Sequence, residues 1–283
     1  MIEIPILGAL AYSAGTILER SILKIKKIKI GLYQVFSFLS IVLILLPFLY
    51  FFWKLDSGAL QLKNILLLAG VIISAIIANL FVFYSEKWEK VTNLEPARIL
   101  EPLFVVLLAI IFSLFTQGLY ESNIKLIVPA IISALALVFP HIKKHHLYIN
   151  KYILAAIFGS FFFALELILS RLILGFYSPI TFYFFRCLGI LLISLVMFRK
   201  QIKLPDRKIL LKIIIAGGIW VVYRVAVYFG YLKLGVVFTT LITMLSAVFI
   251  YLLAFLFLKE KLNWKNILSS GIIIACVLYV LLG

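Results

Sequence analysis

The apolar stretch "LFVVLLAIIF" at residues 103–112 is matched in the second half of the chain by "VFIYLLAFLF" at residues 248–257. Similar runs recur along the whole sequence, separated by short basic or polar segments. A helix of about 20 apolar residues crosses the hydrocarbon core of a bilayer. The sequence therefore predicts an all-α integral membrane protein.

Composition supports this prediction. Of the 283 residues, 65% are hydrophobic and only 13% are charged, whereas soluble domains contain about 25% charged residues. The opening "MIEIPILGAL" lacks a positive n-region and no small-residue cleavage site follows it, so we expect the first span to remain in the mature protein. The apolar runs leave no room for a soluble domain.

The apolar runs and the short polar segments between them predict ten transmembrane helices. Their expected ranges are 4–22, 31–53, 64–84, 93–115, 124–140, 152–174, 179–198, 209–231, 236–258 and 266–283.

The distribution of basic residues predicts the orientation in the membrane. The net charge is +16, but the cations lie in short clusters between apolar spans, which argues against a nucleic-acid surface. The odd-numbered loops hold 17 of the 27 Lys and Arg, including "KIKKIK" at 24–29 and "RKQIKLPDRK" at 199–208. By the positive-inside rule these loops are cytoplasmic and both termini lie outside. We expect the cell (plasma) membrane as the location.

The chain also reads as two copies of one unit. "ILERSIL" at 17–23 aligns with "ILSRLIL" at 168–174, which pairs Arg20 with Arg171, and the matches keep their order along the chain. Residues 1–140 and 152–283 are then five-helix repeats joined by the polar linker 141–151. Because five is odd, the second copy must be inverted, as in many secondary transporters. The alternative is chance similarity between leucine-rich helices.

Four charged residues lie near the centres of their spans: Glu101, Glu166, Arg186 and Arg224. A charge at the bilayer centre costs about 2.5–3.5 kcal/mol on insertion scales, so such residues are candidates for a transport site. Opposite charges from four helices can neutralise one another across a cavity. The alternative is a purely structural network of buried ion pairs, and Arg186 fits this alternative best.

Two segments add detail to this site. In "GGIWVVYRVAVYFGY", Trp220 and Arg224 are four residues apart, so the guanidinium can lie over the indole, and Tyr223 offers a hydroxyl. Aromatic packing is the alternative for Trp220.

In "NLEPARILEP" at 93–102, Glu95 and Arg98 suggest an interfacial ion pair that serves as a gate or as a structural contact. Arg20 and Arg171, near the ends of spans 1 and 6, are expected to have gate or structural roles as well. Pro102 predicts a bend beside Glu101. The aligned segment of the second half is "TLITMLSA" at 240–247, where Glu101 is replaced by Ser246.

Other chemistries lack their motifs. The three histidines, His141, His145 and His146, lie in the linker with no acid or cysteine beside them, so we expect no metal site and no cofactor. The sequence has no nucleotide-binding glycine loop, no G-x-S-x-G and no H-E-x-x-H. We expect a protein that is not an enzyme, with an intramembrane metal enzyme as the remote alternative.

The chain resembles the drug/metabolite transporter superfamily in its EamA-domain branch. The resemblance rests on the two five-span halves, "SPITFYFFRCLGILL" at 178–192, Glu101-Pro102, and the closing "FLKEKLNWKNILSSGIIIACVLYVLL". It implies a basket of ten helices with the pathway between the halves. Two features depart from the family: Gly-Glu after spans 4 and 9 is reduced here to Glu121 and Glu260, and many relatives have cytoplasmic termini.

The sequence and the resemblance together predict a secondary active transporter, an exporter of small polar metabolites such as amino acids. Glu101, Glu166, Arg186, Trp220, Tyr223 and Arg224 are the expected substrate-binding residues. Glu101 is the expected proton-coupling group, because a carboxyl group in a medium of low dielectric binds a proton more readily. Alternatives within the superfamily are a flippase for a lipid-linked sugar and an exporter of cationic drugs.

Overall fold

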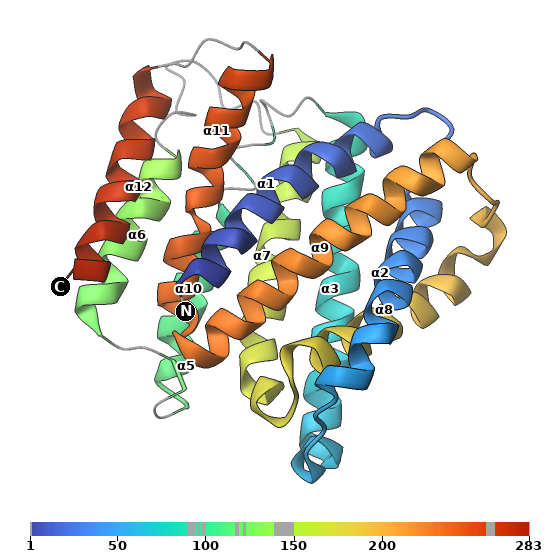
Figure 1. The fold of residues 1–283 in the computed structure, drawn as a ribbon, viewed down its shortest axis with the longest axis horizontal. Helices are drawn as coiled ribbons and strands as arrows, with labels where there is room; N and C mark the ends of the chain where they lie inside the picture. Colours follow the sequence, from blue (N-terminus) through green and yellow to red (C-terminus); the bar gives the residue numbers. More distant parts are fainter. Residues whose placement is uncertain are drawn as a thin grey trace.

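A computed structural model of the chain describes residues 2–89, 94, 97, 100–116, 119–120, 123–138, 150–258 and 264–282. Within these residues the regular structure is helical (Figure 1). The α-helices are α1 (Glu3–Leu23), α2 (Ile30–Phe52), α3 (Leu62–Trp88), α5 (Leu100–Ser113), α6 (Ile124–Val138), α7 (Lys151–Ile173), α8 (Pro179–Phe198), α9 (Arg207–Lys233), α10 (Val236–Thr243), α11 (Leu245–Leu258) and α12 (Trp264–Leu282). Short 3-10 helices span Ser57–Leu60, Leu174–Phe176 and Arg199–Gln201.

The all-α class is confirmed. Among the described residues, 7 helices are long and apolar enough to cross a membrane, and three shorter apolar helices correspond to the expected spans 4, 5 and 9. Large apolar side chains lie on the outside of the bundle, such as Leu66, which is 62% exposed, and Ile111, which is 48% exposed. Such a surface is stable against acyl chains but not against water.

Helices from the two halves of the sequence pack closely together. In Figure 1, α1 lies along α9, α3 along α7, α2 beside α8 and α6 beside α12. Glycines allow the closest approaches: a Cβ atom on Gly8 of α1 would lie 3.0 Å from Ala226 Cβ, and one on Gly159 of α7 would lie 2.7 Å from Val82 Cγ2. Small residues serve this purpose in membranes because they let two backbones approach.

The ninth predicted span is two helices, α10 and α11, with a break at Met244. The hydroxyl of Thr243 donates to the carbonyl of Thr240 at 2.8 Å, and such side-chain bonds compete with the helical ladder. On the other side of the break, the carbonyl of Ser246 accepts a hydrogen bond of 2.9 Å from Ser13 of α1. The break is therefore held against α1.

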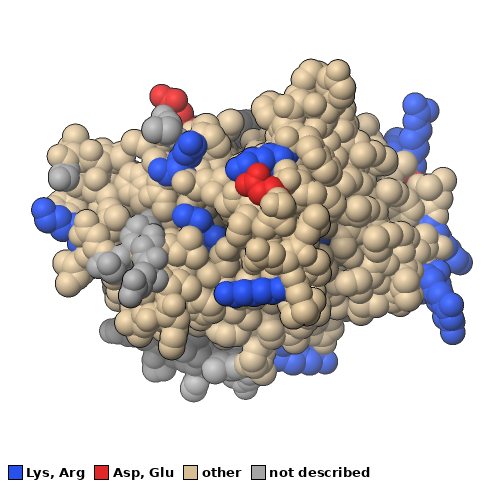
Figure 2. All heavy atoms as spheres, turned by 90° about the horizontal axis from the view of Figure 1, so that it is seen from below, with Lys and Arg blue, Asp and Glu red and all other residues tan. Residues whose placement is uncertain are grey.

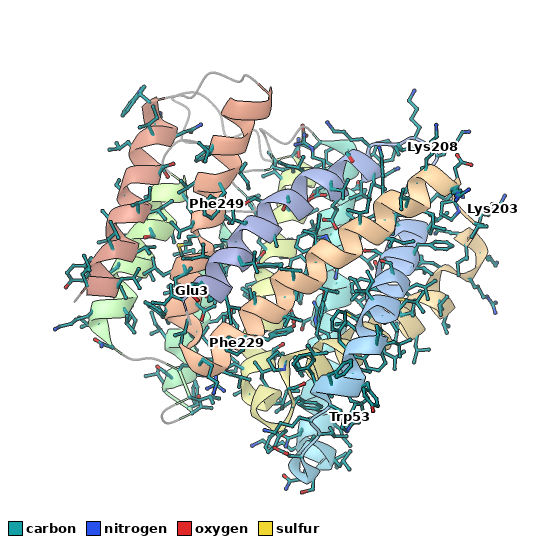
Figure 3. All side chains as sticks on the ribbon, viewed as in Figure 1. Glu3, Trp53, Lys203, Lys208, Phe229 and Phe249 are labelled. Carbon is teal, nitrogen blue, oxygen red and sulfur yellow. The ribbon has the colours of Figure 1, made fainter. Side chains whose placement is uncertain are left out.

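Labelled side chains identify the two ends of the bundle. Lys203 and Lys208 extend from the end that carries the α1–α2 and α8–α9 connections, while Trp53 lies toward the other end (Figure 3). Figure 2 views the molecule from that other end, and uncharged side chains cover most of the face. Trp53 is 55% exposed, which fits the interfacial position expected of a membrane tryptophan.

Candidate functional site

Helices α7, α8 and α9, in the second half of the chain, form a buried ion-pair cluster. The carboxylate of Glu166 on α7 is fully buried, with Oε1 lying 2.8 Å from Nε of Arg186 on α8 and Oε2 lying 3.2 Å from Nη1 of Arg224 on α9. The Tyr228 hydroxyl donates to Oε1 at 2.9 Å, and the Ser170 hydroxyl donates to it at 3.1 Å. One carboxylate thus stabilises two buried guanidinium groups. We call these five residues the Glu166 cluster.

Capping residues fix where the helices of this cluster begin. The Asn150 side chain accepts the backbone N–H groups of Tyr152 and Ile153, each at 2.9 Å, and so begins α7. The Ser178 hydroxyl accepts the N–H of Thr181 at 3.1 Å and begins α8, with proline as the first helical residue. At 1.5 Å per residue, Glu166 lies about 24 Å along α7 from its cap, deep inside the membrane-spanning part.

The prediction that charges from different helices meet in the interior therefore holds geometrically for Glu166, Arg186 and Arg224. The predicted stacking of Arg224 on Trp220 is wrong. The Arg224 Cζ atom lies 5.4 Å from the ring centroid of Phe163 and 5.4 Å from that of Tyr223. The reason is that Glu166 draws the guanidinium toward α7. The Trp220 indole packs edge-on against Tyr12 and Tyr223, with ring centroids 5.8 and 5.6 Å away.

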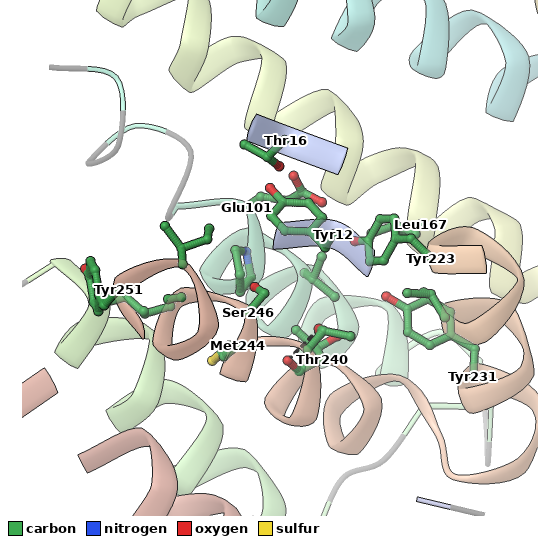
Figure 4. Close-up of a pocket in the computed structure, with 17 residues that line it drawn as sticks. Tyr12, Thr16, Glu101, Leu167, Tyr223, Tyr231, Thr240, Met244, Ser246 and Tyr251 are labelled. Carbon is green, nitrogen blue, oxygen red and sulfur yellow. Dashed lines mark hydrogen bonds between the residues drawn. The ribbon is translucent and has the colours of Figure 1, made fainter. Parts of the chain in front are cut away.

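A cavity with an empty volume of about 860 Å³, counting the space at its mouth, lies between α1, α5, α7, α9 and the broken span α10–α11. We call it the hydroxyl cavity, because Thr16, Thr240, Thr243 and Ser246 line it together with four tyrosines: Tyr12, Tyr223, Tyr231 and Tyr251. Its one charged lining residue within the described structure is Glu101. In Figure 4, Thr16, Tyr12 and Glu101 lie together on one side, and Tyr251 lies at the far side.

A second cavity, with an empty volume of about 580 Å³ counting the space at its mouth, lies beside the Glu166 cluster, and we call it the arginine cavity. Arg186, Arg224, Trp220, Asn79 and Glu19 are among its lining residues. Both cavities are lined by Tyr12, Glu101 and Tyr223, so they meet at these three side chains. All six residues predicted to bind substrate thus lie at these cavities or, for Glu166, directly behind Arg186 and Arg224.

Arg224 retains hydrogen-bonding capacity toward the arginine cavity. A guanidinium group has five N–H donors. In the described part of the chain, its one ion pair uses Nη1 with Glu166, and the side chain is 7% exposed. Arg186 is 2% exposed, and its Nη1 lies 3.9 Å from the Cys187 sulfur. Arg224 is therefore the better placed of the two to contact a ligand, and Arg186 the better placed to hold helices together.

The predicted gate residues lie elsewhere. Arg20 and Arg171 are partly buried in the last turns of α1 and α7 and line neither cavity. Glu95 and Arg98 lie outside the described residues, as do the linker histidines His141, His145 and His146 and the acids Glu121 and Glu260.

Several site residues were not predicted from the sequence. Tyr228 and Ser170 complete the Glu166 cluster, and each stands four residues from a predicted member, which is the signal that could have identified them. Glu19, which was expected near a span end, is buried at 5% exposure and accepts the Tyr33 hydroxyl at 3.0 Å. Thr240 carries no such signal, because an isolated hydroxyl in an apolar span is common.

Comparisons with known proteins agree with this architecture. Comparison with curated proteins gives no match. A solved crystal structure, described only as that of a protein, is similar with a TM-score of 0.73, covering 99% of this chain and 95% of its own, at 15% sequence identity. At that identity the likeness shows the fold alone.

A comparison with protein families matches the second half of the chain. Residues 150–282 match the EamA-like transporter family. This segment contains the Glu166 cluster and the broken span, and it confirms the resemblance that the sequence motifs indicated. The second half of the chain is thus similar to the EamA-like transporter family, in a protein whose described part has 7 helices long and apolar enough to cross a membrane.

Proposed function

We propose that the protein is a secondary active exporter of small polar metabolites that carry both charges, such as amino acids. The observation that carries this proposal is the pair of cavities that meet at Tyr12, Glu101 and Tyr223. One side offers the Arg224 guanidinium, which suits a carboxylate. The other offers the Glu101 carboxylate with hydroxyls and aromatic rings, which suit an ammonium group.

An inverted repeat would supply the alternating access that such a transporter needs. If residues 1–140 and 152–283 are equivalent, exchanging the halves turns the α1–α9 pair into the α7–α3 pair, and both pairs pack closely. Gly8 and Gly159, which give these two contacts, are separated by the same 151 residues as Arg20 and Arg171. The packing thus supports two inverted five-helix halves.

Glu101 is our choice for proton coupling. The sequence has no ATP-binding motif, so transport is driven by the substrate gradient or by a coupled ion. Glu101 lines both cavities, where a proton on its carboxyl group could change the affinity for substrate. A carboxyl group placed between protein and substrate in a medium of low dielectric is a common device for proton coupling.

A second candidate is an exporter of organic cations. The hydroxyl cavity favours it, because its described wall contains one acid, four tyrosines and no Lys or Arg. Such a substrate would occupy the hydroxyl cavity without using Arg224. The two candidates therefore differ in the residue on which binding depends.

Counterflow uptake in proteoliposomes distinguishes them. We expect Arg224→Ala to weaken the affinity for a zwitterionic amino acid about 10- to 100-fold, the effect of losing a charge-assisted hydrogen bond of about 1.5–3 kcal/mol. Arg224→Lys should restore part of it. Arg199→Ala is the matched control, because Arg199 is exposed at the end of α8.

The outcomes are separable. An unchanged affinity in Arg224→Ala would assign Arg224 a structural role. Uptake of a quaternary amine that is equally fast in Arg224→Ala and in the parent, without uptake of amino acids, would favour the organic-cation exporter.

A further inference from the structure

The connection between α1 and α2 lies beside the connection between α8 and α9 at one end of the bundle (Figure 1). A Cβ atom on Gly31, in the first turn of α2, would overlap the Phe198 ring and lie 2.9 Å from Gln201 Oε1. Ile28 of the first connection and Ile202 of the second belong to one apolar cluster. The two connections therefore form one continuous surface over an apolar floor.

Basic side chains cover this surface. Ten Lys and Arg lie within residues 24–29 and 199–212, with Asp206 as the one acid in these two segments. We call them the basic patch: Lys24, Lys26, Lys27, Lys29, Arg199, Lys200, Lys203, Arg207, Lys208 and Lys212. All ten are exposed, and within the described part of the chain none of their side chains forms an ion pair. The positive charge of the patch is thus left to be balanced from outside the protein.

The first connection is held in place from below. The Lys87 ammonium group, at the end of α3, donates a hydrogen bond to the carbonyl of Ile28, and the Ile28 side chain is 3% exposed. Its neighbours Lys27 and Lys29 are exposed, so they point away from the bundle. A backbone that is already fixed has less conformational freedom to lose when its side chains bind a partner.

An apolar side chain stands among these cations. Leu204 follows Lys203 in the α8–α9 connection and is 81% exposed. Figure 3 shows Lys203 and Lys208 extending outward at this end. At a membrane surface, an apolar side chain of this kind can enter the boundary between the headgroups and the acyl chains. Cations with an exposed leucine among them therefore suit a lipid better than a soluble anion.

We propose that the basic patch binds the headgroups of anionic phospholipids in the leaflet that faces this end of the bundle. Clusters of about four to eight Lys and Arg beside a transmembrane helix attract such headgroups. The positive-inside rule alone would use these cations only to orient the chain, and it needs no lipid to stay bound. The lipid site does not depend on the identity of the transported substrate.

Native mass spectrometry of the detergent-purified full chain tests the patch. The protein is titrated with phosphatidylglycerol or with phosphatidylcholine of the same acyl chains. We expect phosphatidylglycerol to bind at least about tenfold more tightly, and higher ionic strength should reduce this preference. In the triple variant Lys26→Gln, Lys27→Gln, Lys203→Gln, the affinity for phosphatidylglycerol should fall about 10- to 100-fold. The reason is that each basic residue near an anionic membrane strengthens binding about fivefold.

The triple variant Lys63→Gln, Lys125→Gln, Lys233→Gln is the matched control. It removes the same charge from helix ends outside the patch. All six substituted side chains are exposed, so both variants should fold like the parent. The control should bind phosphatidylglycerol like the parent. Equal affinities of the parent for the two lipids would overturn the proposal, and so would an equal loss in the two triple variants, because net charge alone would then explain binding.

Glycerol 3-phosphate distinguishes a lipid from a free anion. It carries a phosphate group without acyl chains, so we expect it to bind at least about tenfold more weakly than phosphatidylglycerol. Equal affinities would assign the basic patch to a soluble anion and would overturn the lipid as its partner. Substrate transport by the first triple variant is measured separately, so loss of lipid binding leaves the proposed function to be tested by its own variants.

Discussion

The two cavities share three lining residues yet hold charge in opposite ways. In the arginine cavity, Arg186 and Arg224 are held by Glu166 at 2.8 and 3.2 Å, so the protein supplies their counter-charge. In the hydroxyl cavity, Glu101 stands among hydroxyls and rings with no cationic side chain in the described wall. The first arrangement stabilises the fold at the position where a ligand can also bind. The second places a carboxylate between the two cavities, within electrostatic reach of Arg224.

The same contrast exists between α1 and α7. With the separation of 151 residues that relates Arg20 to Arg171, Gly15 of α1 corresponds to Glu166 of α7 under the proposed repeat. A Cβ atom on Gly15 would lie 3.2 Å from Ile219 Cγ2, so α1 packs directly on α9 at this point. One half therefore uses the position for close packing, and the other uses it for charge. Four substitutions test this contrast.

Removing the counter-charge should have the largest effect. Glu166→Leu leaves Arg186 and Arg224 buried without their carboxylate, and breaking a buried pair in this way costs about 3–5 kcal/mol. We expect a strongly lowered unfolding midpoint or loss of folded protein in fluorescence-detected size-exclusion chromatography. Adding Arg186→Met should recover part of the loss. If Glu166→Leu unfolds like the parent, the cluster does not hold the helices together.

Filling the contact between α7 and α3 should have an intermediate effect. A Cβ atom on Gly159 would lie 2.7 Å from Val82 Cγ2 and 3.3 Å from the Ala78 carbonyl oxygen. Gly159→Val therefore overpacks this interface and should lower the free energy of unfolding by about 1–3 kcal/mol. The unfolding midpoint measures the change. Gly271→Val in α12 is the control, because nothing lies within 4 Å of that position. Equal midpoints for the two variants would contradict the close approach.

Trimming the cluster should have a smaller effect. Tyr228→Phe removes a 2.9 Å hydrogen bond to Glu166 but leaves both ion pairs in place. The expected loss is about 1.5 kcal/mol, because the acceptor is charged and remains partnered. Tyr50→Phe, at a side chain that is 86% exposed, should leave the midpoint unchanged. A loss as large as that of Glu166→Leu would mean that Tyr228 has a role beyond this bond.

The sequence predicted the helices better than the details of the site. Apolar length is enough to place helices, and the cost of a buried charge is enough to bring Glu166, Arg186 and Arg224 together. The ring that Arg224 meets depends on the rotation of α9 about its axis, which one helix alone does not determine. The break at Met244 was also not predicted, because it contains neither proline nor glycine and arises from hydroxyls that bond to backbone carbonyls.

Glu101→Gln should have the smallest effect on folding and the clearest effect on transport. Glutamine is nearly isosteric with glutamate, and the cavity wall already contains polar groups. We therefore expect a free energy of unfolding within about 0.5 kcal/mol of the parent's. If Glu101 couples transport to protons, a pH gradient should no longer drive uptake in proteoliposomes, while counterflow exchange of substrate continues. Uptake driven by the pH gradient at the parent rate would remove Glu101 as the coupling group. Loss of both gradient-driven uptake and exchange would instead make Glu101 a substrate-binding residue. This variant therefore tests whether the charge in the hydroxyl cavity serves an ion, while the Glu166 variant tests whether the charge in the arginine cavity serves the fold.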